Sequence, residues 1–212
     1  LLKHLSFIAA GLALILFSEG LSSVLTSHES TLRQAQAFAH TLNDKTNRAS
    51  KAIHELQNEI NTVGPKRVQA TRSNKFHERF TKEGISFFVF RNDELILWTD
   101  NKISPESARR VATLGTEIHH FDNGWYRLLY FTDGLDEYIA SILLSRTFPY
   151  RNEYLVSGFT KDFAQENLES IHLNGAPGRI KLQADHQTFY LSFTQDLGKS
   201  KTRAIAYAIV TL

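Results

Sequence analysis

Two apolar stretches bracket the chain and constrain its fold more than any other feature. The first, Leu5–Leu25, has the roughly 20 residues that a membrane-spanning helix needs, although it contains Glu19 and several serines. The second begins near Ala204 and runs to Leu212. We expect a transmembrane anchor in residues 1–25, the start of a second transmembrane helix in residues 203–212, and a water-exposed domain between them. We also expect the chain, which begins with leucine and has no methionine, to be a fragment of a longer receptor.

The first stretch has a second interpretation. Its most apolar part, Leu5–Phe17, follows Lys3 and His4 and has the length of the apolar region of a signal peptide. Cleavage would then release a secreted binding protein. The helical pattern that follows directly and the second apolar run favour an uncleaved anchor.

A heptad stripe follows the first apolar stretch. From Leu32 to Val63, apolar and small residues recur at alternating intervals of three and four, which keeps one seam of a helix facing a partner. Gly64-Pro65 ends the pattern, because proline cannot continue a helix. We predict a long membrane-proximal helix over residues 26–64, with Thr26 and Glu29 spaced as a capping box near its start. The seam either packs on its own domain or, in its first half, pairs with the same helix of a second subunit. The seam residues expected in that dimer contact are Ala35, Ala39 and Leu42.

Apolar runs separated by turn residues predict an antiparallel sheet after this helix. Residues 85–91 are apolar on both alternating faces, which is typical of a central strand covered on both sides. Asn92-Asp93 then forms a two-residue turn into a second strand. Further strands are predicted at residues 125–131, 137–145, 179–183 and 188–194, and short helices at 66–83, 105–114 and 152–162. The fold class is therefore α+β, with a long N-terminal helix and an antiparallel sheet of five or six strands over residues 65–202. This arrangement resembles the PAS-like and Cache-like sensor folds.

The composition excludes several classes of site. Cysteine is absent, so disulfides, thiolate catalysis and cysteine-ligated metals are excluded. The 24 basic and 22 acidic residues are interspersed, and no basic stripe suggests nucleic acid as a partner. No catalytic motif occurs in the sequence. The adjacent His119 and His120 point to opposite faces of a strand and make a poor chelate. We therefore expect no catalytic residue, no cofactor and no metal in this chain.

Aromatic and guanidinium side chains near the predicted central strands are the best candidates for a ligand site. Pockets are commonly lined by aromatic groups with a few polar groups that fix orientation. Arg91 offers a planar fork suited to a carboxylate or phosphate, and Trp98 and Tyr126 offer apolar walls. We predict these three residues at the rim of a cavity that binds a small anionic or amphipathic molecule. The alternative is that these are core residues, that the cavity is filled, and that the domain senses a partner protein or the membrane.

Several segments resemble the sensor regions of membrane-bound sensor histidine kinases of Bacteroidetes-type bacteria. The hairpin Gly84–Asn101 (GISFFVFRNDELILWTDN), the Asn123-Gly124-Trp125-Tyr126 segment and the Phe148–Phe163 region carry the resemblance, which covers the middle of the chain. It implies an extracytoplasmic sensor domain whose continuation would hold a dimerisation and phosphoacceptor helix pair and an ATP-binding kinase domain.

From these observations we expect the signal-sensing module of a two-pass, homodimeric receptor in the bacterial inner membrane. Its soluble part would be periplasmic and would respond to a small ligand or a periplasmic protein. The same module on a chemotaxis receptor or a cyclic-nucleotide enzyme is the alternative, together with the secreted binding protein. The sequence leaves open the signal, the output domain and the cognate response regulator.

Overall fold

One uninterrupted helix forms the spine of the molecule. The computed structural model describes the backbone of residues 2–150 and 155–194, and the side chains of these residues from Glu29 onward. Helix α1 spans Leu2–Val63, about 93 Å at 1.5 Å per residue. Because the helix continues through Thr26, the predicted helix start there is wrong: the backbone N–H groups that a capping box would satisfy lie inside a helix.

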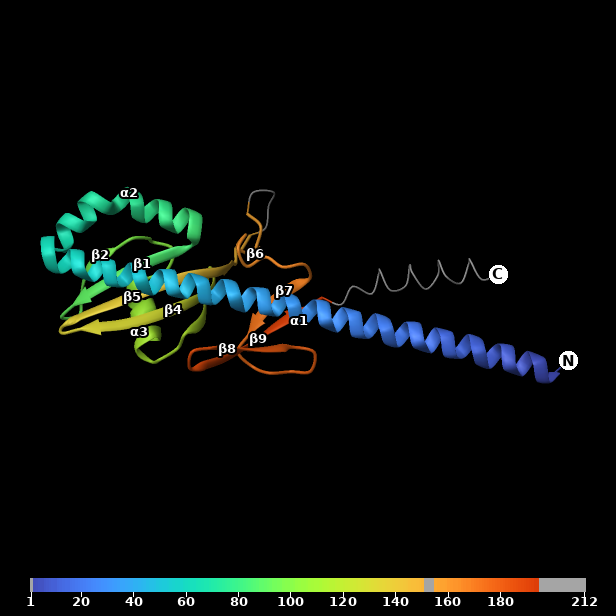
Figure 1. Cartoon of the computed structure of the whole chain (residues 1–212). Helices are drawn as coiled ribbons and strands as arrows, with labels where there is room; N and C mark the ends of the chain where they lie inside the picture. Colours follow the sequence, from blue (N-terminus) through green and yellow to red (C-terminus); the bar gives the residue numbers. More distant parts are fainter. Residues whose placement is uncertain (1, 151–154, 195–212) are drawn as a thin grey trace.

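Gly64 ends α1, as predicted. Its backbone N–H donates to the carbonyl of Ile60 at 2.9 Å, and its φ of 83° lies in the region that glycine tolerates best. After Gly64 the chain changes direction and forms α2 (Pro65–Glu83). Its first residue, Pro65, is the proline that follows the heptad stripe in the sequence. Helix α2 packs beside the end of α1 and against β1 and β2 (Figure 1).

The larger sheet is antiparallel and contains the strands that the apolar runs predict. Its order is β2-β1-β5-β4-β3, and the short β6 pairs with the end of β5. Asn92 and Asp93 form the predicted tight turn, both with positive φ. Helix α3 (Pro105–Thr113) lies between β2 and β3 in sequence. The strands are β1 (Ile85–Arg91), β2 (Glu94–Trp98), β3 (Ile118–Phe121), β4 (Gly124–Asp133), β5 (Asp136–Arg146) and β6 (Gly158–Phe159).

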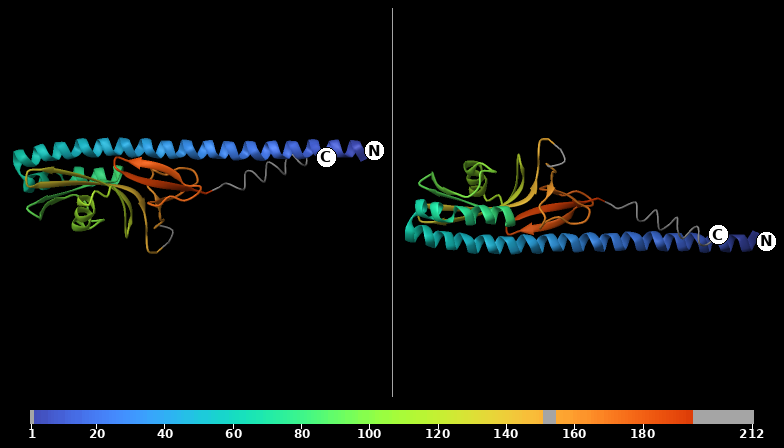
Figure 2. Two further views of the ribbon diagram at one scale, coloured as in Figure 1. Left: turned by 90° about the horizontal axis from the view of Figure 1, so that it is seen from below. Right: turned by 90° about the horizontal axis from the view of Figure 1, so that it is seen from above.

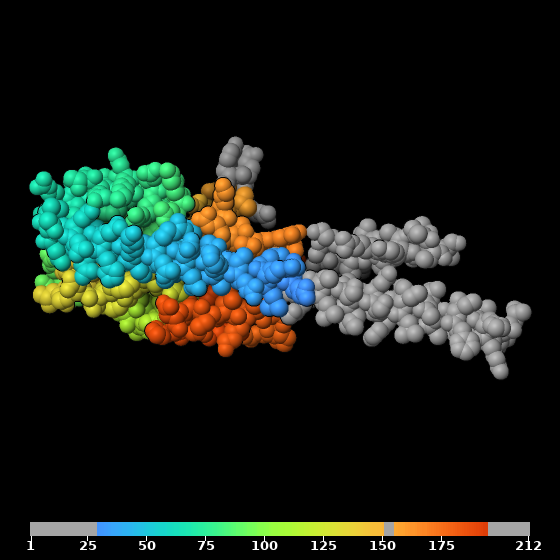
Figure 3. Space-filling model, in the orientation of Figure 1, coloured from blue at the N-terminus to red at the C-terminus, as the bar shows by residue number. Residues whose placement is uncertain are grey.

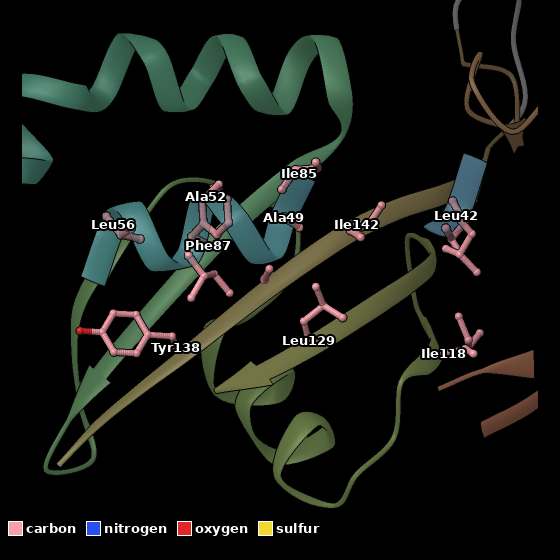
Figure 4. Packing of buried hydrophobic residues seen from close by; sticks show 14 of the residues in the cluster. Leu42, Ala49, Ala52, Leu56, Ile85, Phe87, Ile118, Leu129, Tyr138 and Ile142 are labelled. Carbon is pink, nitrogen blue, oxygen red and sulfur yellow. The ribbon is translucent and has the colours of Figure 1, made fainter. Parts of the chain in front are cut away.

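Strand β1 is buried on both faces, which confirms the prediction of a central strand. Phe87 and Val89 belong to the core cluster that also contains Ala49, Ala52 and Leu56 of α1 (Figure 4). Phe88 and Phe90 belong to a second cluster, on the opposite face, that includes Ala108 and Ala112 of α3. The sheet is thus covered by α1 on one side and by α3 on the other (Figure 2).

A second, smaller sheet replaces the single continuous sheet that the sequence predicts. It has the order β7-β9-β8, with strands β7 (Leu168–His172), β8 (Ile180–Ala184) and β9 (Gln187–Phe193). The closing hairpin β8–β9 was expected, whereas β7 was not. The helix predicted over residues 152–162 is wrong in its described part: residues 155–162 form β6 and a turn, and residues 151–154 lie outside the described chain.

The two sheets lie one after the other along α1. The larger sheet packs on the second half of the helix, and the smaller sheet lies beside residues nearer its N-terminus (Figures 1 and 3). The N-terminal part of α1 projects beyond both sheets (Figure 2). In the part of the chain whose side chains are described, no helix is long and apolar enough to cross a membrane. The predicted anchors, residues 1–25 and 203–212, fall outside that part.

Candidate functional site

The structure separates the three residues that were predicted to share one cavity. Arg91 ends β1 beside the turn into β2, where it pairs with Glu94 in the strand register. Trp98 lies at the other end of β2, opposite Phe88. Tyr126 lies on β4, which is separated from β2 by β1 and β5. These positions do not converge on a common pocket.

The fork of Arg91 is engaged by the chain itself. Its Nε and one terminal nitrogen donate to the two carboxylate oxygens of Asp136, both at 2.6 Å. Asp136 is buried, and the bidentate bond from the guanidinium holds the pKa of this carboxyl below its usual value. Arg91 therefore links β1 to β5. Because its guanidinium already makes a bidentate pair with Asp136, it is not available to bind an anionic ligand in the same way.

Tyr126 is a core residue. It is 1% exposed and packs among the aromatic and aliphatic side chains between the sheet and α3, with the ring of Phe121 at 5.6 Å. Burial raises the pKa of its hydroxyl to about 12. This burial favours the alternative in which the aromatic strand residues serve as core.

Trp98 lines a hollow at the surface, and the residue is 41% exposed. The hollow has a volume of about 110 Å³ and lies between one side of α2 and the end of β2 with its following loop. We call it the Trp98 hollow; it is lined by Gln69, Ser73, Phe76, Trp98, Thr99, Asp100 and Asn101. Sequence reasoning missed Asp100 and the α2 residues, because only the fold brings α2 beside β2.

Two of the predicted seam residues face their own domain. Ala35 and Leu42 are 1% and 2% exposed and belong to the main core cluster, and Ala39 is half-buried. Between them Phe38, which the heptad assignment passed over, packs against rings of the second half of the chain. A single chain does not test the homodimer, which stays a prediction; its contact would need a face of α1 other than that of Ala35 and Leu42.

A buried lysine joins α1 to the junction of the two sheets. Lys45 is 1% exposed and lies on the buried seam of α1 between Leu42 and Ala49. Its Nζ donates to the carbonyl oxygen of Glu83, the last residue of α2, and forms an ion pair with Asp162 at 2.6 Å. The segment of Asp162 leads into the smaller sheet. Lys45 thus connects α1 to the end of α2 and to the segment between β6 and β7.

A second buried cation fastens the smaller sheet to the larger one. Arg127 of β4 is 1% exposed and donates to Asp185, in the turn between β8 and β9, at 2.6 Å. The side-chain oxygen of Gln187 accepts hydrogen bonds from the backbone N–H groups of Glu117 and Ile118 at 2.8 and 2.6 Å. The β8–β9 hairpin is therefore fixed by polar contacts to β3 and β4.

Within the described residues, no group of three or more histidine, aspartate or glutamate side chains could hold a metal ion. The ring of His119 lies 4.7 Å from that of Phe121, and the ring of His120 lies 5.0 Å from that of Trp125. Each histidine thus contacts a different aromatic neighbour. Comparisons of the chain with protein-family models, with curated proteins and with solved structures found no match.

Proposed function

We propose that the chain is the extracytoplasmic sensing module of a two-pass membrane sensor histidine kinase. The observation that carries the proposal is that one unbroken helix, α1, packs on both sheets and also contains the apolar run Leu5–Leu25. A change in either sheet can then reach the helix that would enter the membrane. We propose further that the domain is PAS-like or Cache-like; the long N-terminal helix and the antiparallel order β2-β1-β5-β4-β3 support this proposal.

The contacts of Lys45 supply a physical link for such a signal. Movement of α2 would shift the Glu83 carbonyl that accepts from Lys45, and Lys45 also holds Asp162 at the start of the path into the smaller sheet. Helix displacements of about 1–2 Å are sufficient for this kind of coupling in known transitions. In this proposal, α2 and the larger sheet receive the signal, and α1 with the smaller sheet carries it toward the membrane.

Paired reporter fusions test the placement of the domain. Fusion near Gly175, in the exposed loop before β8, should give an active alkaline phosphatase, which folds only outside the cytoplasm, and a dark green fluorescent protein. A matched fusion after Lys3 should give the opposite pair. A fluorescent, phosphatase-inactive fusion near Gly175 would remove the extracytoplasmic assignment and with it the proposed function.

A further inference from the structure

The Trp98 hollow is large enough for a compact ligand. A cavity of about 10–15 Å³ already holds one water molecule, and this hollow has about 110 Å³. Its walls come from two elements that are distant in sequence, α2 and the end of β2. The exposed ring of Trp98 marks the side on which the hollow meets solvent.

Two hydrogen-bond acceptors belong to residues that line the hollow, beside side chains that can both donate and accept. Asp100 contributes a half-buried carboxylate whose Oδ2 accepts from the backbone N–H of Lys102 at 2.8 Å. The side-chain oxygen of Gln69 is buried and has no hydrogen-bond partner among the described residues. A buried acceptor without a donor costs free energy, so a rotation of the Gln69 amide that brings this oxygen to a donor in the hollow is favoured.

The lining of the hollow contains an acidic side chain and no basic one, in contrast to the anion site that the sequence suggested. Asp100 is the only ionisable side chain in its lining, and Arg91 is held elsewhere by Asp136. Burial raises the pKa of Asp100, while Lys102 and Arg146 nearby favour its ionised form. A carboxylate partly removed from water is stabilised by a cation brought next to it.

Aromatic rings complete the lining. Trp98 and Phe76 border the same hollow as the carboxylate. The face of an indole ring attracts a cation, and the rest of each ring offers apolar contact to an alkyl chain. An acidic group, an unpaired acceptor and an indole together match an ammonium group attached to a short hydrocarbon.

We propose that the Trp98 hollow binds a small protonated primary amine. The ammonium group donates hydrogen bonds to the carboxylate of Asp100 and, once the Gln69 amide has rotated into the hollow, to its Oε1; the alkyl part packs against Trp98 and Phe76. The idea that the amine is the signal of a receptor rests on the proposed function. The idea that the hollow binds an amine does not.

Tryptophan fluorescence of the full 212-residue chain in mild detergent tests the site. The chain has two tryptophans, so Trp125→Phe leaves Trp98 as the single reporter. Titration with n-propylammonium chloride at pH 7 and constant ionic strength should give a saturable change. Propionate and n-propanol, which match the probe in size, should give none. A change of the same size with either of these controls, or no saturable change with the amine, would overturn the proposal.

Matched variants assign the binding to named groups. Asp100→Asn keeps the shape of the side chain and should weaken amine binding at least tenfold, and Gln69→Leu should weaken it by a smaller factor. Asp44→Asn removes an equal charge from an exposed site on α1 and should leave the affinity unchanged. Circular dichroism confirms folding of each variant. Unchanged affinity in folded Asp100→Asn, or in Gln69→Leu if the first variant does not fold, would refute the assignment.

The two proposals fail separately. Amine binding by a chain whose Gly175 reporter is cytoplasmic would remove the sensor function and keep the site. An extracytoplasmic reporter with no amine binding would remove the site alone.

Discussion

Truncation of Phe38 tests how firmly α1 holds the smaller sheet. Phe38 is fully buried, and its ring centroid lies 6.0 Å from that of Phe159, 4.9 Å from that of Phe163 and 6.2 Å from that of Phe189. All of these partners belong to the second half of the chain. A Phe→Ala change in a core lowers the free energy of unfolding by about 3–5 kcal/mol. Part of this cost is the apolar burial that is lost, and part is the cavity that neighbouring side chains fill only incompletely. We expect Phe38→Ala to fall in the upper half of that range, since three aromatic contacts are lost together.

Urea unfolding of the full chain, followed by circular dichroism, measures this cost. Leu32→Ala is the matched control, because Leu32 lies on the same helix but is 37% exposed and should change the free energy of unfolding by about 0.5 kcal/mol or less. Proteolysis should also become faster at residues 158–194 than in the larger sheet. A loss below about 1 kcal/mol for Phe38→Ala, with unchanged proteolysis, would refute the packing of α1 on the smaller sheet.

Phe87→Ala and Phe88→Ala should each cost about 3–5 kcal/mol in the same unfolding assay, because the two side chains are buried on opposite faces of β1; a near-neutral result for one of them would show that its face is open to solvent. Asp100→Asn should raise the free energy of unfolding at neutral pH and lose this advantage in acid. The reason is that burial raises the pKa of Asp100 on folding. Such a carboxyl contributes stability below its unfolded pKa and loses that contribution as pH rises through the folded pKa. Equal effects of the substitution at pH 3 and pH 7 would show that burial of Asp100 is not the cause. If α1 mediates a homodimer, a single cysteine at the exposed Gln36 should crosslink between subunits in membranes and one at the buried Ala35 should not; the reverse order would mean that the α1 seam opens in the dimer.

Local signals in the sequence were sufficient for most elements of the larger sheet. The run of apolar residues in β1 and the Asn92-Asp93 turn each depend on a few neighbouring residues, and both predictions are confirmed. The end of α1 at Gly64 follows from backbone chemistry alone. Two of the three strands of the smaller sheet were predicted; β7 (LESIH) was not, because it has no clear alternation and forms by pairing with β9.

The candidate site depended on contacts that the sequence does not contain. From the sequence alone, Arg91 was a reasonable candidate for an anion ligand. The register of β1 with β5, however, places Asp136 opposite it. Lys45 was not predicted to be buried; a carbonyl and a carboxylate from distant segments satisfy its charge there. Asp100 lies after the end of β2, and only the packing of α2 beside β2 gives it a hollow.

Hydrogen exchange of the full chain, with and without saturating n-propylammonium, tests the central claim that α1 links signal reception to the smaller sheet. Saturation is set by the Trp98 fluorescence titration. The account predicts slower exchange both at the Trp98 hollow and in residues 158–163 and β9, which pack on α1 around Phe38 and Lys45. Slower exchange confined to α2 and β2, with residues 158–163 and β9 unchanged while the amine is bound, would contradict it.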